Sequence, residues 1–483
     1  KSGTPEIKQI GTGLCYLFKR KSITMTLTYL RIAILTGLLT ITANVSSQVM
    51  IDETTVDTNT VITGLDIPWE IQYGHDGWLW VTERYGRVSR IHPETGEQDI
   101  ILNHSGTVTQ QGESGMLGMA FHPDFPDDPR IYIVYTYSDN GIKERLVHFT
   151  YNGSELVDET ILIEGIQGNN IHDGSRLVFA PDGKLMMTTG DANNLSAPQN
   201  PENLNGKILR INPDGTIPND NPFGDSFVYT WGHRNAQGLD YAPDGTLYSS
   251  EHGPNSDDEI NLIEEGRNYG WPDVMGYCDT PGEQEFCDEF NVKEPMTAWT
   301  PTIAPSDIIY YDHDMIPEWT GSILLTVLKN KRVVELELSD DGQDITGENH
   351  YFINYWGRLR DICAGPEGEI YLATNGDSWS NNNPFTHSII RLKAGSSTGD
   401  YHKGSQKPFR ISVNSHTGTL VVETNESLAS ANWYIVDIMG RVKDSGRIEQ
   451  SRMVLETSFE PGVYVFKIDG SQSKPLADKF FIH

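Results

Sequence analysis

The sequence predicts an all-β protein, built as a six-bladed β-propeller followed by a small C-terminal β-sandwich. Three observations support this prediction. Short apolar runs are bounded by Asp-Gly, Pro-Asp and Asn-Pro turns, a turn-and-strand phrase recurs along the chain, and the composition is rich in Gly (46), Tyr (21) and Trp (10). The chain of 483 residues is long enough to bury a sizeable core.

The recurring phrase is a tight turn followed by a short apolar or alternating strand. Four clear copies are HDGWLWVTE from His75, PDGKLMMTTGD from Pro181, PDGTLYSSEHG from Pro243 and PEGEIYLATNGD from Pro366, and looser copies begin at His122 and Glu318. Six units therefore fill the chain between about residue 58 and residue 393, with room for long loops. The propeller is expected over residues 49–393. A large sandwich is the alternative, but it does not require a regularly recurring phrase.

Residues 1–48 are expected to comprise an upstream segment and a signal peptide. After Met25, Arg31 precedes an apolar run over 32–41, and small polar residues follow that run. The run is too short to cross a bilayer, which takes roughly 20 apolar residues. The sequence therefore predicts a secreted protein with no membrane span in its mature form.

A linker and a small β-domain are expected after the propeller. Residues 394–408 are rich in Gly, Ser and Lys, as flexible linkers are, and residues 409–483 contain strand-like phrases such as WYIVDIMGRVKDSG. With its IMGRV and PGVYVFKI phrases, this tail resembles the C-terminal sorting domain of the type IX secretion system. The resemblance implies secretion machinery as a partner and a secreted or cell-surface location reached through the periplasm. A carbohydrate-binding or purely structural appendage is the alternative.

Charge and cysteine content narrow the function classes. The chain has 67 acidic residues against 36 Lys and Arg, and its formal net charge of −31 argues against nucleic acid as a partner. The same carboxylates supply the oxygen ligands that calcium prefers. Cys278 and Cys287 lie in a polar, turn-prone stretch and are expected to form a disulfide in an oxidising compartment. No CxxC motif occurs, which argues against a cysteine zinc site.

Polar and charged residues gather where predicted strands end. His172 lies in NNIHDGSRL, Asp191 closes the strand of the same repeat, and Arg234 lies in WGHRNAQGLDY. A histidine beside a carboxylate has the makings of a general base, although a single histidine in a β-rich loop is more often structural. Gly253 and Pro254 precede several acidic residues, a pattern typical of either a calcium site or a solvated acidic turn.

Longer phrases resemble the soluble PQQ-dependent glucose/sorbosone dehydrogenases. These phrases are GESGMLGMAFHPDF, NIHDGSRLVFAPDGKLMMTTGD, TWGHRNAQGLDYAPDGTLYSSEHGPNSDDEINLIEEGRNYGWP, WTPTIAPS and GRLRDI, and the resemblance runs from about Thr63 to Lys393. It implies a calcium- and PQQ-dependent oxidoreductase that converts aldose sugars to lactones at the anomeric carbon and passes electrons to a separate acceptor.

The resemblance also implies roles for individual residues. His172 would remove the proton of the anomeric hydroxyl while hydride passes to PQQ, and Asp191 would orient it. Arg234 would polarise the quinone oxygen. The main-chain carbonyls of Gly253 and Pro254 would hold the Ca²⁺ that binds PQQ.

Further contacts follow from the same resemblance. The residues expected to contact PQQ are Glu113, His172, Arg234, Asn235, His252, Trp299, Lys329, Arg358 and Arg360. A second calcium site is expected at Glu259, Tyr269 and Asp279.

Three positions depart from the glucose-specific members of the family. Glu113 replaces a Gln, Ile171 stands where an acid is expected, and Ser196 replaces an amide side chain. These departures favour a broader aldose dehydrogenase, with the sugar left open. Two other classes stay open: a non-catalytic propeller that serves as a binding module, and a calcium-dependent lactonase, which would need side-chain carboxylate ligands in the channel.

Overall fold

The computed structural model describes residues 47–51, 53–376, 385–395 and shorter stretches between 409 and 482. Residues 1–46 of the expected upstream segment and signal peptide, and residues 396–408 of the expected linker, lie outside the described residues. The chain divides into two compact units, Lys1–Gly395 and Ser396–His483, which are described separately. Among the described residues, no helix has the length and apolar character needed to cross a membrane.

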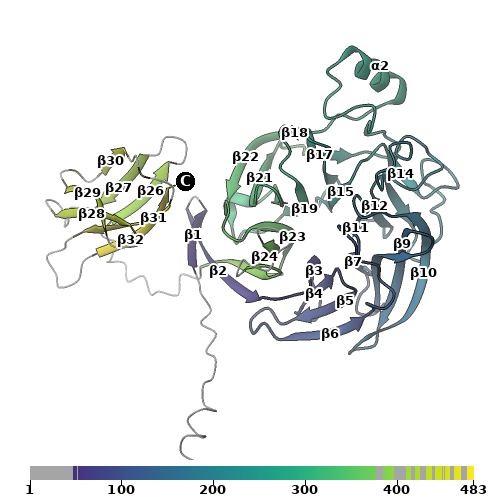
Figure 1. Ribbon diagram of the computed structural model, residues 1–483, viewed down its shortest axis with the longest axis horizontal. Helices are drawn as coiled ribbons and strands as arrows, with labels where there is room; N and C mark the ends of the chain where they lie inside the picture. The colour runs from purple at the N-terminus through teal and green to yellow at the C-terminus, as the bar shows by residue number, and fades with distance from the viewer. Residues whose placement is uncertain are drawn as a thin grey trace, which may run out of the picture. The chain divides into compact units, whose positions relative to one another are not determined.

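The described residues of the first unit form almost entirely antiparallel sheets, so the prediction of an all-β protein is confirmed (Figure 1). Five four-stranded sheets follow one another along the described chain: β3 (Pro68–Tyr73), β4 (Leu79–Glu83), β5 (Arg87–Ile91) and β6 (Gln98–Asn103); β7 (Met116–Phe121), β8 (Arg130–Ser138), β9 (Ile142–Tyr151) and β10 (Leu156–Gln167); β11 (Gly174–Phe179), β12 (Leu185–Thr189), β13 (Lys207–Ile211) and β14 (Val228–Trp231); β15 (Ala236–Tyr241), β16 (Leu247–Glu251), β17 (Asp258–Ile263) and β18 (Thr297–Trp299); β19 (Pro305–Tyr311), β20 (Ser322–Val327), β21 (Arg332–Leu338) and β22 (Ile345–Tyr351). A further sheet joins both ends of the unit, in the order β1 (Ser47–Ile51), β2 (Thr54–Ile62), β25 (Ile389–Ala394), β24 (Ile370–Gly376) and β23 (Arg358–Ala364). Within the part of this unit that the structure describes, two short helices, α2 (Pro281–Phe290) and the 3₁₀ helix η1 (Pro317–Trp319), interrupt the strands.

The first strands of the sheets form a closed ring. β3 contacts β7, β7 contacts β11, and the order continues through β15, β19 and β23, which returns to β3. Figure 1 shows the sheets arranged around this common centre, an arrangement consistent with a β-propeller. The pairing of β2 with β25 joins the two ends of the unit and closes the ring.

Each recurring phrase of the sequence supplies the second strand of a different sheet, namely β4, β8, β12, β16, β20 and β24. Gly183 and Gly245 have φ angles of +79° and +93°, which glycine adopts without strain. Asp182 and Asp244 accept hydrogen bonds from the backbone N–H two residues on, at 3.1 and 2.9 Å. β12 and β16 are buried along their whole length, because neighbouring sheets cover both of their faces.

A buried ion cluster joins the first strands of four sheets. The Arg176 guanidinium on β11 lies 2.5 Å from Glu70 on β3, 3.1 Å from Asp307 on β19 and 2.7 Å from Asp361 on β23. Burial raises the pKa of Glu70 to about 7 and raises the pKa of both aspartates. One cation therefore faces three carboxyl groups in the middle of the ring.

Replacing Arg176 by Met is expected to destabilise the protein by about 3–5 kcal/mol at neutral pH, because it leaves buried carboxyl groups without a cation. These carboxyl groups have folded pKa values above their unfolded values, so the folded protein binds more protons and loses stability as pH rises between the two values. More of these carboxyl groups are ionised at about pH 8 than at about pH 5, and the ionised groups need the cation. The loss of unfolding free energy caused by Arg176→Met should therefore be larger at about pH 8 than at about pH 5 in urea unfolding. Lys393→Met removes a cation from an exposed pair with Glu367 and should cost about 0–1 kcal/mol. An equal loss in both variants would contradict the role of the cluster.

The second unit contains two sheets among its described residues. One consists of β26 (Phe409–Asn414), β27 (Thr419–Thr424) and β30 (Arg452–Glu456), and the other of β29 (Val442–Arg447), β28 (Asn432–Asp437), β31 (Gly462–Ile468) and β32 (Leu476–Ile482). Leu420 and Val422 of the first sheet share one apolar cluster with Trp433, Ile435 and Phe466 of the second. The unit therefore has a core of its own.

Candidate active site

His172 lies in the short loop between β10 and β11, and the backbone holds it tightly. Its φ is +62°, a backbone conformation that residues other than glycine adopt only when the surroundings enforce it. Its N–H donates to Glu113 Oε2 at 3.1 Å, and its carbonyl accepts from the Ala192 N–H at 3.1 Å. A Cβ atom on Gly190 would lie 1.9 Å from that carbonyl oxygen, so position 190 requires glycine. The imidazole is therefore presented from a fixed backbone.

Neighbouring side chains define the tautomer of His172. Its Nδ1 lies 2.8 Å from Asp191 Oδ1, and its Nε2 lies 3.1 Å from Arg234 Nη2. Asp191 is buried, and its other oxygen accepts from the Trp271 indole at 2.9 Å. Because a guanidinium can only donate, Nε2 must accept, and Nδ1 carries the proton shared with Asp191. The site therefore presents a neutral imidazole with a lone pair on Nε2, as a general base requires.

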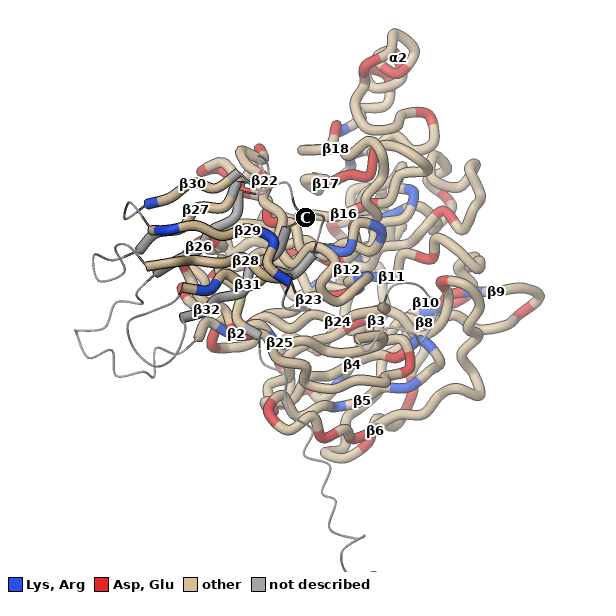
Figure 2. The backbone as a smooth tube through the Cα atoms, turned by 60° about the vertical axis from the view of Figure 1, so that its left-hand side comes forward, with Lys and Arg blue, Asp and Glu red and all other residues tan. Residues whose placement is uncertain are grey.

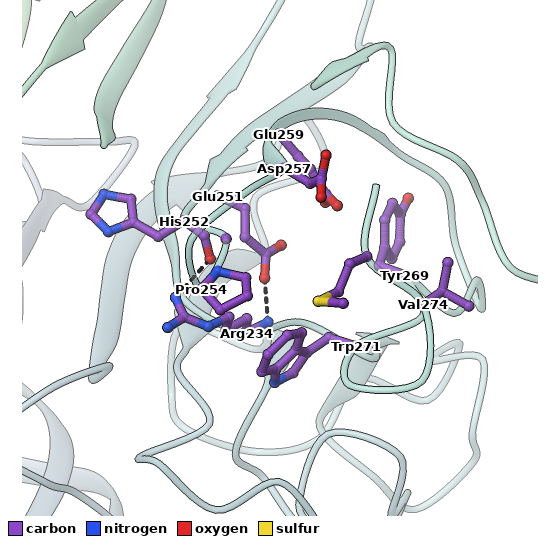
Figure 3. A pocket seen from close by; sticks show the side chains of 11 residues that line it. Arg234, Glu251, His252, Pro254, Asp257, Glu259, Tyr269, Trp271 and Val274 are labelled. Carbon is purple, nitrogen blue, oxygen red and sulfur yellow. Dashed lines mark hydrogen bonds between the residues drawn. The ribbon is translucent and has the colours of Figure 1, made fainter. Parts of the chain in front are cut away.

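Arg234 lies in the loop between β14 and β15, next to the imidazole. Its Nη1 donates to the His252 carbonyl at 2.9 Å (Figure 3), and its Cζ lies 5.2 Å from the centre of the Trp271 ring. Its Nε is buried and has no hydrogen-bond partner within the described chain. Burial lowers the pKa of Arg234. This guanidinium therefore keeps a donor for a ligand oxygen.

Glu251, at the end of β16, organises the loop that carries Arg234. Its carboxylate accepts from the backbone N–H groups of Arg234 and Asn235, the second at 3.1 Å, as Figure 3 shows for Arg234. Its other oxygen lies 2.9 Å from His233 Nδ1, and His233 is fully buried and stacks on Tyr269. His233 is therefore structural, and Asn235 and Arg234 are held by one carboxylate.

Glu251 and Trp271 were missing from the predicted site. Glu251 ends the second strand of its sheet, much as Asp191 follows β12, so the strand-end rule that identified Asp191 also applies to it. The contact between Trp271 and Asp191 spans 80 positions, and no local pattern signals it.

The turn at Gly253 and Pro254 is fixed by a buried carboxylate. Asp258 accepts from the Gly253 N–H at 2.8 Å and from the N–H groups of Ile303 and Ala304 at 2.6 and 2.7 Å. A Cβ atom on Gly253 would lie 1.9 Å from the Ser256 carbonyl oxygen. Among the described residues, no hydrogen bond ends on the carbonyl of Gly253 or Pro254. Both residues line a pocket of about 270 Å³ next to Arg234 (Figure 3).

The structure brings together only part of the expected second calcium site. Glu259 and Tyr269 line the same pocket, whereas Asp279 is exposed and does not. The Tyr269 hydroxyl donates to the Leu262 carbonyl at 2.8 Å, and Glu259 accepts from the Gly276 N–H at 2.9 Å. Desolvation, followed by the nearby Glu251 carboxylate, raises the pKa of Glu259 to about 8. In the part of the chain that the structure describes, no group of three or more His, Cys, Asp or Glu side chains is placed to hold a metal ion.

A second pocket of about 380 Å³, called the channel pocket below, lies among the first strands of the sheets. It is lined by Trp69, Glu113, Leu117, Asp173, Gly174, Gln237, His252, Leu328, Arg358 and Arg360. Burial lowers the pKa of Arg358. Burial also lowers the pKa of Arg360, and repulsion from the neighbouring cations Arg358 and Arg84 adds to this effect, so that the pKa falls to about 9. Burial would raise the pKa of Glu113, but His252, the His172 N–H and Arg360 together oppose burial, and the pKa is lowered. Two arginines therefore face the Glu113 carboxylate in the channel pocket, and this excess of positive charge suits an anionic ligand.

Other expected contacts lie apart from these groups or have partners of their own. Lys329 is exposed and donates to Thr302 Oγ1 at 2.8 Å, and the Trp299 indole donates to the Glu348 carboxylate at 3.1 Å. His252 lines both pockets, and its Nε2 lies 2.5 Å from the Pro305 carbonyl.

A disulfide bond links the two ends of the segment that carries most of α2. Cys278 and Cys287 are bonded, with 6.5 Å between their Cα atoms, and Thr280 caps the helix with Glu283. Figure 2 shows acidic residues along this helix.

The fold and site define a class of protein: a ring of β-sheets that holds a histidine–aspartate pair, an adjacent arginine and a cationic central pocket. The chain belongs to the glucose/sorbosone dehydrogenase family, a family of oxidoreductases, whose model matches residues 65–380.

The matched regions span most of the length of the named relatives. Quinoprotein glucose dehydrogenase B of Acinetobacter calcoaceticus is 31% identical, over 66% of this chain and 85% of that protein. Aldose sugar dehydrogenase YliI of Escherichia coli K12 is 28% identical, over 69% of this chain and 94% of that protein. The PQQ-bound structure of an aldose sugar dehydrogenase from Streptomyces coelicolor is similar with a TM-score of 0.62 and 29% identity, over 72% of this chain and 98% of that one.

Proposed function

We propose that this protein is a calcium- and PQQ-dependent dehydrogenase that oxidises aldose sugars to lactones at the anomeric carbon. The observation that carries the proposal is the placement of His172 between Asp191 and Arg234. The relatives named as a quinoprotein and as an aldose sugar dehydrogenase, and the PQQ-bound neighbour, support the choice of cofactor and substrate class.

The channel pocket fits PQQ, which carries three carboxylates. It combines the apolar side chains of Trp69, Leu117 and Leu328 with a few polar and charged groups, as ligand pockets do. Burial lowers the pKa of Arg358 and Arg360, the two guanidinium groups that line it. Guanidinium groups pair well with carboxylates, so we assign cofactor binding to these arginines, with Lys329, Asn235, Glu113, His252 and Trp299 as further contacts. When bound, PQQ would supply the acceptor for the two electrons.

The turn at Gly253 and Pro254 fits Ca²⁺, because calcium takes main-chain carbonyl oxygens as ligands. Both carbonyls are free of hydrogen bonds within the described chain, and Asp258 fixes the turn. Calcium bound there would act as a Lewis acid beside Arg234. A second calcium site at Glu259, Tyr269 and Asp279 would require Asp279 to approach the other two residues.

His172 would take the proton of the anomeric hydroxyl on Nε2. Arg234 donates to that nitrogen in the structure, so the sugar hydroxyl must take the place of this contact. Asp191 would stabilise the imidazolium that forms, since its oxygen already accepts from Nδ1. Arg234 would then donate to the oxygen on which negative charge develops. Glu113, Ile171 and Ser196 would shape the sugar site of a broad aldose dehydrogenase.

The proposal is tested by adding PQQ and CaCl₂ to the purified protein and following dye reduction with a panel of aldoses. We expect a change in the PQQ absorbance on binding, turnover with several sugars, loss of turnover with EDTA and its return with Ca²⁺. Binding without turnover would favour the non-catalytic binding module. Hydrolysis of lactones without PQQ would favour the lactonase, and absence of both binding and turnover would refute the dehydrogenase.

We further propose that the ring of sheets over residues 49–393 is a six-bladed propeller and that residues 409–483 form a sandwich that serves as a type IX sorting domain. The closed contacts of the first strands and the shared core of the last two sheets support these assignments. The protein would then be exported through the periplasm to the medium or the cell surface. Mass spectrometry of secreted protein, with and without residues 409–483, tests this proposal: equal secretion would refute it.

A further inference from the structure

Asp173 is a buried carboxyl group of the channel pocket that the proposed chemistry does not use. It follows His172 directly, is 4% exposed and lines the pocket together with Glu113. Its Oδ1 accepts from the Asn169 N–H at 2.9 Å. Its Oδ2 is buried and has no hydrogen-bond partner among the described residues. A buried, ionised carboxylate with a single hydrogen bond and no ion pair would be costly, so the neutral acid is favoured.

The charged groups around Asp173 also favour its neutral, protonated form. Glu113 faces it across the pocket, and Glu144 on β9 lies behind it with one oxygen also unpartnered within the described chain. Arg84 is the cation that faces it, and the guanidinium of Arg84 donates to main-chain carbonyls such as Ser114 O at 3.0 Å. Burial, and after it Glu113, raises the pKa of Asp173 to about 8, although the Asn169 N–H and Arg84 oppose the change. His172, its chain neighbour, is engaged with Asp191 instead.

We propose that Asp173 is a neutral hydrogen-bond donor for the cofactor: the acid keeps its proton and donates it to an acceptor atom of PQQ in the channel pocket. This inference rests on the proposed function. An ionised carboxylate at this position would repel an anionic cofactor, whereas the acid adds a donor and no charge. Binding of PQQ is therefore coupled to the proton on Asp173, and loss of that proton weakens binding.

The test is the dissociation constant of PQQ, measured by quenching of tryptophan fluorescence in CaCl₂ from about pH 6.5 to about pH 9.5. In the wild type, we expect a constant value below neutral pH and a weakening of up to about tenfold per pH unit above about pH 8. Asp173→Asn keeps a donor and cannot ionise, so it should bind as tightly at neutral pH and should not weaken until the pH approaches the pKa of Arg360, about 9. The control Asp127→Asn, at an exposed turn, should keep the wild-type slope.

A measurement without ligand tests the proton directly. The infrared spectrum of the wild type at neutral pH should contain a carboxylic acid C=O band that is absent from Asp173→Asn, and this difference should vanish at about pH 9.5. If the wild type binds no PQQ at any pH, the proposed function and this inference both fail. If it binds PQQ but Asp173→Asn keeps the full slope, or if the infrared band is missing, only this inference fails.

Discussion

Replacing His172 by Ala is expected to lower the turnover of aldose sugars by about 10²- to 10⁴-fold, the usual contribution of a general base. The variant loses the Nε2 lone pair that the structure presents between Asp191 and Arg234. Binding of PQQ should persist with little change, because Arg358 and Arg360 line a pocket that His172 does not line. The effect should therefore appear in kcat, with the PQQ dissociation constant nearly unchanged.

The measurement is dye reduction under saturating PQQ and CaCl₂, together with a PQQ titration of the same preparation. Added imidazole should restore part of the activity of His172→Ala, which a purely structural histidine would not allow. His75→Ala is the matched control, because His75 lies on the exposed turn between β3 and β4. Turnover that is unchanged in His172→Ala would show that another group is the base.

The all-β fold was predictable because its signal is local. Three of the six turn-and-strand phrases, those at His75, Pro181 and Pro243, carry an Asp that accepts a backbone N–H and a Gly with positive φ, and each of the six phrases became the second strand of one sheet. The closure of the ring by β2 and β25 was not predicted, because it pairs Thr58 with Leu392 across the whole unit. Nothing near either strand encodes that pairing.

For the site, too, the residues with a local signal in the sequence were predictable and those that depend on distant contacts were not. His172, Asp191 and Arg234 were identified from phrases at strand ends and from the family resemblance, and the structure places these three side chains in contact. Trp271 and the ion cluster of Arg176 were missed, because their partners come from distant repeats. Asp173 was also missed, since its role depends on burial and on an unpaired oxygen, which the sequence does not reveal.

Replacing Arg234 by Lys is expected to lower kcat by about 10²- to 10³-fold, as loss of a donor to developing negative charge does elsewhere. The guanidinium uses Nη1 for the His252 carbonyl and Nη2 at His172 Nε2, and its Nε is unpaired among the described residues. An ammonium group has the charge but not this planar fork, so it cannot hold the carbonyl and also reach the ligand oxygen.

The decisive measurement is the separation of kcat from KM in Arg234→Lys and Arg234→Ala. A donor used in the transition state should lower kcat and kcat/KM together, whereas a group that only binds substrate should raise KM alone. Arg130→Lys, in a partly exposed pair with Asp128, is the control and should leave both constants unchanged. If Arg234→Lys also leaves kcat unchanged, positive charge alone is sufficient at this position. If Arg234→Ala does so as well, the charge stabilisation comes from a group other than the arginine, and the calcium proposed at the Gly253 turn is the next to test.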